Sequence, residues 1–173
     1  RFSATNEYNP DSSSITVPTS KLEATANTKL LMLNAPGFFD KSGDAHAITL
    51  QGVPAIREKG PYDYMTYKAA NNAGSIVFDG NDSLVTAASS DFTVGTGQFT
   101  VEAWVKFEST SQQTIFCLAD ASAVDMNMFY MSAKLYVYDS SSELGNGGTL
   151  SQNVFHHLVV QRDASHISGY VDG

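Results

Sequence analysis

The stretch that decides the fold is Phe99 to Phe107, which reads FTVEAWVKF. Apolar and polar residues alternate along it with a period of two, as in a strand whose successive side chains point to opposite faces of a sheet. One face is wholly apolar and is predicted to form core. The other face is predicted to stay outside the core, and it carries Thr100, Glu102, Trp104 and Lys106.

Further short strands are predicted along the chain, rich in β-branched and aromatic residues and separated by Gly, Asn, Asp and Ser. They lie at 29–33, 47–50, 75–78, 83–86, 114–118, 128–131, 134–138, 155–161 and 167–171. Residues 75–86 are predicted to form one hairpin, and residues 145–148 a turn. Residues 64–72 give at most one helical turn. The chain is therefore predicted to be all-β, a sandwich of two antiparallel sheets.

Composition restricts the function classes. Only 16% of the residues are charged, so Ser, Thr, Asn, Gln and Gly must cover much of the surface, as suits an extracellular or virion protein. The formal net charge of -8 repels phosphate backbones and anionic lipid headgroups, so neither nucleic acid nor membrane insertion is expected. The single cysteine, Cys117, lies in the apolar run TIFCLA and is predicted to be a buried small hydrophobe.

The two ends of the chain differ from its middle. Residues 1–28 lack apolar periodicity and hold Pro- and Ser-containing stretches, so they are predicted to be a linker or extended arm. Residues 29–173 are predicted to be one sandwich domain. The chain stops at Val171-Asp172-Gly173, which reads as the turn of a hairpin whose second strand is missing. We therefore expect a segment of a longer polypeptide, without its C-terminal strands.

The order of these pieces resembles the laminin G-like or concanavalin A-like jelly roll of the type found in phage tail fibre and virion surface proteins. The matching elements are DKSGDAH at 40–46, GSIVFDG at 74–80, DSLV at 82–85, SDF at 90–92, GQFTVEAWV at 97–105, HHLVVQR at 156–162 and GYVDG at 169–173. The resemblance covers about residues 28–173 and implies two stacked antiparallel sheets. It also implies that residues 1–28 are the junction to an upstream domain. Phe155 departs from the family, which usually has tryptophan there, but a large aromatic residue is retained.

Catalysis is not expected. The resemblance implies a comparison with glucanases on the related jelly roll, which place two glutamates at i and i+4 on one strand face, as nucleophile and acid. The strand at 99–107 carries Glu102 alone, and Glu108 lies beyond its apolar run. The sequence also shows no Ser-His-Asp order, phosphate-binding glycine loop or paired-cysteine site. The chain is therefore predicted not to be an enzyme.

The polar face of the 99–107 strand is the candidate binding site. An exposed indole at Trp104 would stack on the apolar face of a sugar ring, while polar neighbours bond to its hydroxyl groups. The candidate ligand-binding residues are Thr100, Glu102, Trp104 and Lys106. The alternative is that Trp104 packs beneath a loop or a missing strand and that Glu102 pairs with Lys106.

Calcium is the one cofactor that we consider. The resemblance implies oxygen-rich loops that often hold calcium, and two turns offer side-chain oxygens that would share an ion if the loops met. The candidate ligands are Asp79, Asn81, Asp82 and Asp172. The same residues are ordinary turn formers, so a structural role is the alternative. His156 and His157 are adjacent in a predicted strand and point to opposite faces, so they cannot share an ion.

Three functions agree with these features. The leading hypothesis is a noncatalytic jelly-roll module of a phage-like virion surface protein, in a fibre or as capsid decoration, that contributes to host-surface or glycan binding. The second is a purely structural virion or assembly protein whose arm laces subunits together. The third is a secreted cellular adhesin. The expected partners are other virion subunits or neighbouring domains, the expected state is oligomeric, and the expected location is the virion surface or the extracellular space.

Overall fold

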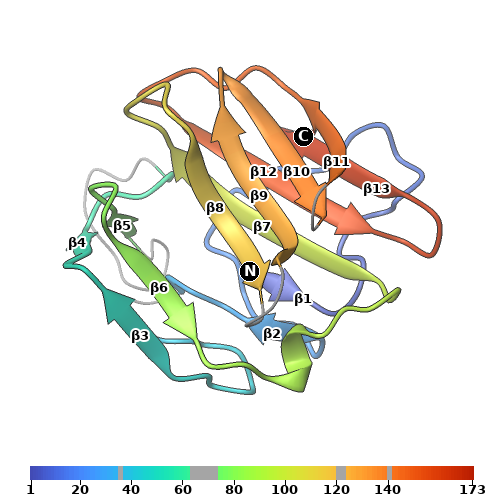
Figure 1. Ribbon diagram of the computed structural model, residues 1–173, viewed down its shortest axis with the longest axis horizontal. Coiled ribbons are helices and arrows are strands. Elements are labelled where there is room, and N and C mark those ends of the chain that lie inside the picture. Colours follow the sequence, from blue (N-terminus) through green and yellow to red (C-terminus); the bar gives the residue numbers. More distant parts are fainter. Residues whose placement is uncertain (35–36, 63–73, 120–123, 140–141) are drawn as a thin grey trace. The chain divides into compact units, whose positions relative to one another are not determined.

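The computed structural model describes residues 1–34, 37–62, 74–119, 124–139 and 142–173. Apart from a short 3-10 turn, η1 (Ser90–Phe92), its elements are β-strands, and each described pairing is antiparallel (Figure 1). The all-β prediction is confirmed. The predicted helical turn at 64–72 falls outside the described residues. No helix in the described part of the chain is long and apolar enough to cross a membrane.

The chain divides into two compact units. The first consists of residues 1–4 and 18–93, and the second of residues 5–17 and 94–173. Each unit is thus built from two separate stretches of sequence. The predicted domain boundary at residue 28 stays a prediction.

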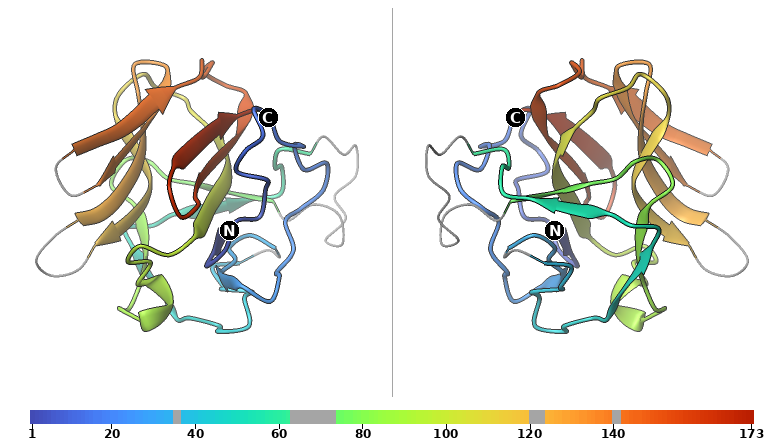
Figure 2. Two further views of the ribbon diagram at one scale, coloured as in Figure 1. Left: turned by 90° about the vertical axis from the view of Figure 1, so that its right-hand side faces the viewer. Right: turned by 90° about the vertical axis from the view of Figure 1, so that its left-hand side faces the viewer.

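The second unit holds two antiparallel sheets, which Figure 2 shows as two layers. One sheet has the order β13-β12-β7 and consists of β7 (Phe99–Lys106), β12 (Phe155–Arg162) and β13 (Ile167–Val171). The other has the order β11-β10-β9-β8 and consists of β8 (Gln113–Ala119), β9 (Val124–Met131), β10 (Lys134–Asp139) and β11 (Ser142–Gly147). This is the predicted sandwich, with β7 paired to β12 along its whole length.

The core of the second unit lies between these sheets. Side chains that alternate along the strands point inward and remove apolar surface from water, each contributing roughly 1.5–3 kcal/mol when fully buried. The buried side chains in and beside the strands include Phe99, Val101, Phe107, Leu158 and Val160 from one sheet and Met126, Met128, Tyr130, Leu135 and Val137 from the other. The rings of Phe107 and Tyr130 stack with centroids 4.1 Å apart. The apolar face of the 99–107 stretch is therefore core at Phe99, Val101 and Phe107, as predicted, whereas Ala103 and Val105 are half-buried.

The first unit is built from three short strand pairs. They are β1 (Phe2–Ser3) with β2 (Thr28–Leu30), β3 (Ile48–Gln51) with β6 (Ser83–Thr86), and β4 (Ala55–Arg57) with β5 (Ser75–Val77). The hairpin predicted over residues 75–86 is therefore wrong, because β5 and β6 each pair with an earlier strand. The turn between them is closed by a side chain: the two Asp82 carboxylate oxygens accept the N–H groups of Asp79 and Val53, at 3.0 and 2.7 Å.

Strand β11 was missed by the sequence interpretation, which read 145–148 as a turn. Its residues, SELGNG, have weak β-propensity. Pairing with β10 overrides that propensity, since Leu135 lies opposite Gly147 and Tyr136 opposite Asn146, and the register shifts only between Val137 and Tyr138. The fold thus gains an edge strand made of turn-forming residues.

Candidate functional site

The predicted binding face of β7 is largely closed. Thr100 and Glu102 are only 1% exposed, Trp104 is half-buried, and Lys106 alone is exposed. The prediction that this face stays outside the core is therefore wrong for its first half. The proposed pairing of Glu102 with Lys106 is also wrong, because the Lys106 ammonium lies 3.3 Å from the Glu108 carboxylate.

Residues 5–17, which we call the covering segment, close this face. The Thr100 hydroxyl donates to the carbonyl of Thr5 at 2.9 Å and accepts the N–H of Glu7 at 3.1 Å. Farther along, the Tyr170 hydroxyl of β13 donates to the carbonyl of Ser12 at 2.9 Å. Polar side chains of the sheet thus form hydrogen bonds with backbone groups of the covering segment, as expected for polar groups that are buried together.

A buried polar cluster lies beneath the covering segment. The Tyr8 hydroxyl donates to Oε2 of Glu102 at 2.7 Å, and Nε2 of His157 lies 3.2 Å from the same oxygen. The side chains of Glu102 and His157 are completely buried, and the Trp104 ring packs against the imidazole with centroids 5.2 Å apart. This cluster holds the segment in place, and its carboxylate has no open path to a substrate.

Three of the four candidate calcium ligands, Asp79, Asp82 and Asp172, already use side-chain oxygens in hydrogen bonds within their own units. In the first unit, Oδ1 of Asp79 accepts the N–H of Asn81 at 2.8 Å, and Asp82 closes the turn described above. In the second unit, the two oxygens of Asp172 face Nδ1 of His156, at 2.6 Å, and the N–H of His157, at 2.8 Å. Calcium binding by these residues stays a prediction.

Three other side chains of the first unit could hold a metal ion by their spacing. The ligand atoms of Asp44, His46 and Asp91 lie within 4.8 Å of one another. However, the Lys29 ammonium lies 3.2 Å from Asp44 and 3.1 Å from Asp91. The bonds to Asp91 and Asp44 raise the pKa of Lys29, and the bond from Lys29 lowers the pKa of the Asp91 carboxyl. The group therefore contains its own cation, and it is an ion-pair cluster.

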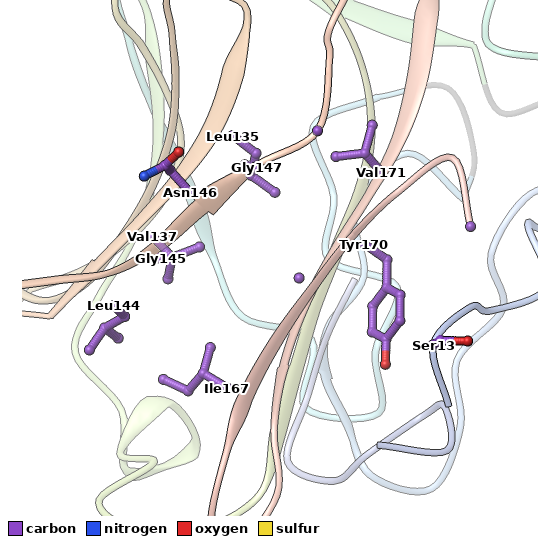
Figure 3. A pocket seen from close by; sticks show the side chains of 13 residues that line it. Ser13, Leu135, Val137, Leu144, Gly145, Asn146, Gly147, Ile167, Tyr170 and Val171 are labelled. Carbon is purple, nitrogen blue, oxygen red and sulfur yellow. The ribbon is translucent and has the colours of Figure 1, made fainter. Parts of the chain in front are cut away.

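A cavity of about 330 Å³ lies between β10 and β11 on one side and β13 on the other (Figure 3). Leu135, Val137 and Ile167 point into it, whereas Asn146 points away on the far side of β11. Five aliphatic side chains and five glycines make up most of the lining: Leu135, Val137, Leu144, Ile167, Val171, Gly145, Gly147, Gly148, Gly169 and Gly173. Ser13, Asn146 and Tyr170 complete the lining, which holds no carboxylate and no imidazole.

The opposite face of β9, β10 and β11 carries a group of aromatic and polar side chains that we call the ring face. The Tyr136 ring stacks on Phe129 with centroids 5.4 Å apart and planes at 6°, and the Tyr138 ring centroid also lies 5.4 Å from that of Phe129. The Tyr138 hydroxyl donates to Oε2 of Glu143 at 3.1 Å, and the Asn146 amide donates to Oε1 of the same carboxylate. The ring face comprises Phe129, Lys134, Tyr136, Tyr138, Glu143 and Asn146.

Residues 79–173, more than half of the chain, match the laminin G-like family model described as the concanavalin A-like lectin/glucanases superfamily. The chain belongs to this superfamily. No curated protein and no solved structure matched the chain. The resemblance found in the sequence is thus confirmed at the level of the superfamily, whose sandwich fold agrees with the two sheets of the second unit.

Membership of the superfamily does not by itself locate a site. Sequence reasoning chose the face of β7, which the covering segment closes, and missed the ring face. Part of the ring face could be predicted, because Tyr136 and Tyr138 are two residues apart in a predicted strand and so share a side. Glu143 and Asn146 could not, because they lie in the missed strand β11.

Proposed function

We propose that this chain is a noncatalytic recognition module of a phage-like virion surface protein, a fibre or capsid decoration, that binds glycans on the host surface. The observation that carries the proposal is the burial of Glu102, the one acidic residue of β7. Its carboxylate is bonded to Tyr8 and faces His157, so it cannot reach a glycosidic bond. In a superfamily of lectins and glucanases, a strand without the paired carboxylates favours the binding role.

An arm that laces neighbouring subunits together is less well supported. Within residues 1–28, the covering segment bonds to its own unit, through Thr100, Glu102 and Tyr170. Polar groups that already form hydrogen bonds within their own unit are not available for hydrogen bonds to a second subunit. We therefore favour recognition at the virion surface over a purely architectural role.

Glycan-array and host-cell binding assays with the purified protein test this function. We expect binding to a restricted set of glycans and no release of reducing ends from those glycans on prolonged incubation. Repeating the binding step with EDTA tests the calcium prediction. Absence of binding to every glycan and to host cells contradicts recognition, and release of reducing sugar contradicts the noncatalytic assignment.

A further inference from the structure

We propose that the ring face binds the uncharged pyranose rings of a glycan, with Tyr136 as the stacking platform. This inference rests on the function proposed above and names its site. It replaces the face of β7 as the ligand-binding surface. Three features of the ring face carry it: a held aromatic plane, polar groups beside that plane, and the charge of those groups.

The Tyr136 ring is supported by the ring of its cross-strand neighbour, Phe129. Phe129 is 6% exposed and lies nearly parallel to Tyr136, so the half-buried Tyr136 ring is supported on one side by a buried ring. Phe129 also contacts Tyr138, which holds the second ring at 41° to its own plane. Aromatic rings held in this way lose little conformational freedom on binding, and they offer a flat apolar surface to the C–H face of a sugar.

Polar groups form a continuous chain beside this plane. The Lys134 ammonium lies 3.4 Å from the Asn146 amide oxygen, the Asn146 amide donates to Glu143, and the Tyr138 hydroxyl donates to the other Glu143 oxygen. Asn146 lies directly opposite Tyr136 in the ladder, so the chain runs past the platform. A carboxylate has about four acceptor positions, so Glu143 keeps acceptors for sugar hydroxyl groups. Lys134, Glu143 and Asn146 are exposed and can reach a ligand.

Charge selects among glycans. Glu143 is the exposed acceptor of the chain beside the platform, and its hydrogen bond raises the pKa of Tyr138, which keeps the phenol protonated as a donor. A uronate, sialate or sulfate group beside the platform would approach this carboxylate in a protein of net charge -8, and like charges repel; the Lys134 ammonium at the other end of the chain offsets this repulsion only in part. Uncharged pyranoses present hydroxyl donors instead, and they match the Glu143 oxygens. A protein partner with an apolar surface would leave the same polar groups without partners.

The test compares variants of the ring face with a variant of the face of β7, on arrays of neutral and anionic glycans. For a neutral glycan that the wild type binds, we expect Tyr136→Ala to weaken binding roughly tenfold, since the stacking contact is lost. Tyr136→Phe keeps the ring and is expected to stay within about threefold. Trp104→Ala is the matched control, an aromatic residue removed from the closed face, and is expected to bind as the wild type does.

A second variant guards against misfolding. Glu143→Ala removes an exposed side chain of the edge strand β11 and is expected to weaken binding of neutral glycans at an unchanged melting temperature. If the wild type binds neutral glycans but Tyr136→Ala and Glu143→Ala bind equally well, the site is wrong while the proposed function stands. If the wild type binds only anionic glycans, the substrate class is wrong. If it binds no glycan, or only proteins, the proposed function fails as well.

Discussion

At the scale of single residues, Cys117 is a position where the burial predicted from the sequence differs from the structure. The apolar run around it predicts a buried thiol, yet the side chain is exposed. The pairing of β8 with β9 is irregular between Thr114 and Phe116, and beyond this point Leu118 is the buried residue and Cys117 faces the other side. An uninterrupted apolar run has no period, so the sequence could not decide which of the two neighbours points inward.

We therefore expect the thiol of Cys117 to react with a small disulfide reagent in the native protein. Partial burial raises the pKa of this thiol, and only the thiolate is nucleophilic, so the reaction should be slow at pH 7 and accelerate as the pH rises. Absorbance measurements of the thiol released from the reagent, at pH 7 and at higher pH values, provide the check. Cys117→Ser should release no reagent thiol, and a wild-type reaction that begins only in denaturant would contradict the exposed position.

At the scale of elements, the sequence predicted strands well and their neighbours poorly. The period of two located β7 and its core-facing side, because a strand with one face toward the core carries apolar residues at alternate positions. The interpretation of residues 75–86 as one hairpin gave β5 and β6 the wrong partners, since strand pairing depends on contacts with residues distant in the sequence. The closure of the predicted site depends on the same kind of contact: nothing in residues 5–17 marks Tyr8 as the partner of Glu102.

The covering segment gives the prediction at this scale. Tyr8→Phe removes the hydroxyl that donates to the buried Glu102 carboxylate, so we expect the free energy of unfolding to fall by about 1–3 kcal/mol. Tyr138→Phe is the matched control, because its hydroxyl donates to Glu143, an exposed carboxylate, where water replaces the lost bond. Urea denaturation of both variants measures the difference. Equal losses would show that burial of the Glu102 cluster does not stabilise the fold.

At the scale of the whole molecule, stability depends on carboxylates that are hydrogen-bonded only in the folded state. Burial acts to raise the pKa of Asp40, but the N–H groups of Leu31, Ser42 and His46 and the Ser42 hydroxyl outweigh it and lower the pKa. The bonds from Lys29 and Ser89 lower the pKa of Asp91, and N–H groups of two following residues lower that of Asp163. Each carboxylate therefore binds its proton more weakly in the folded protein than in the unfolded chain.

The direction of the pH dependence follows from these shifts. A carboxyl whose pKa is lowered on folding contributes its full stability above its usual value of 3.8, and the contribution is lost as the pH falls through the folded value. We expect the free energy of unfolding to be nearly constant from pH 7 to 5 and to fall steeply below about pH 4. Asp40→Asn should cost about 1–3 kcal/mol at pH 7, because an amide cannot accept all four bonds, and should make the decline in acid shallower. Urea denaturation at a series of pH values measures both effects, with the exposed Glu58→Gln as the control that should follow the wild type. An Asp40→Asn profile parallel to that of the wild type would mean that this buried carboxylate does not link folding to protons.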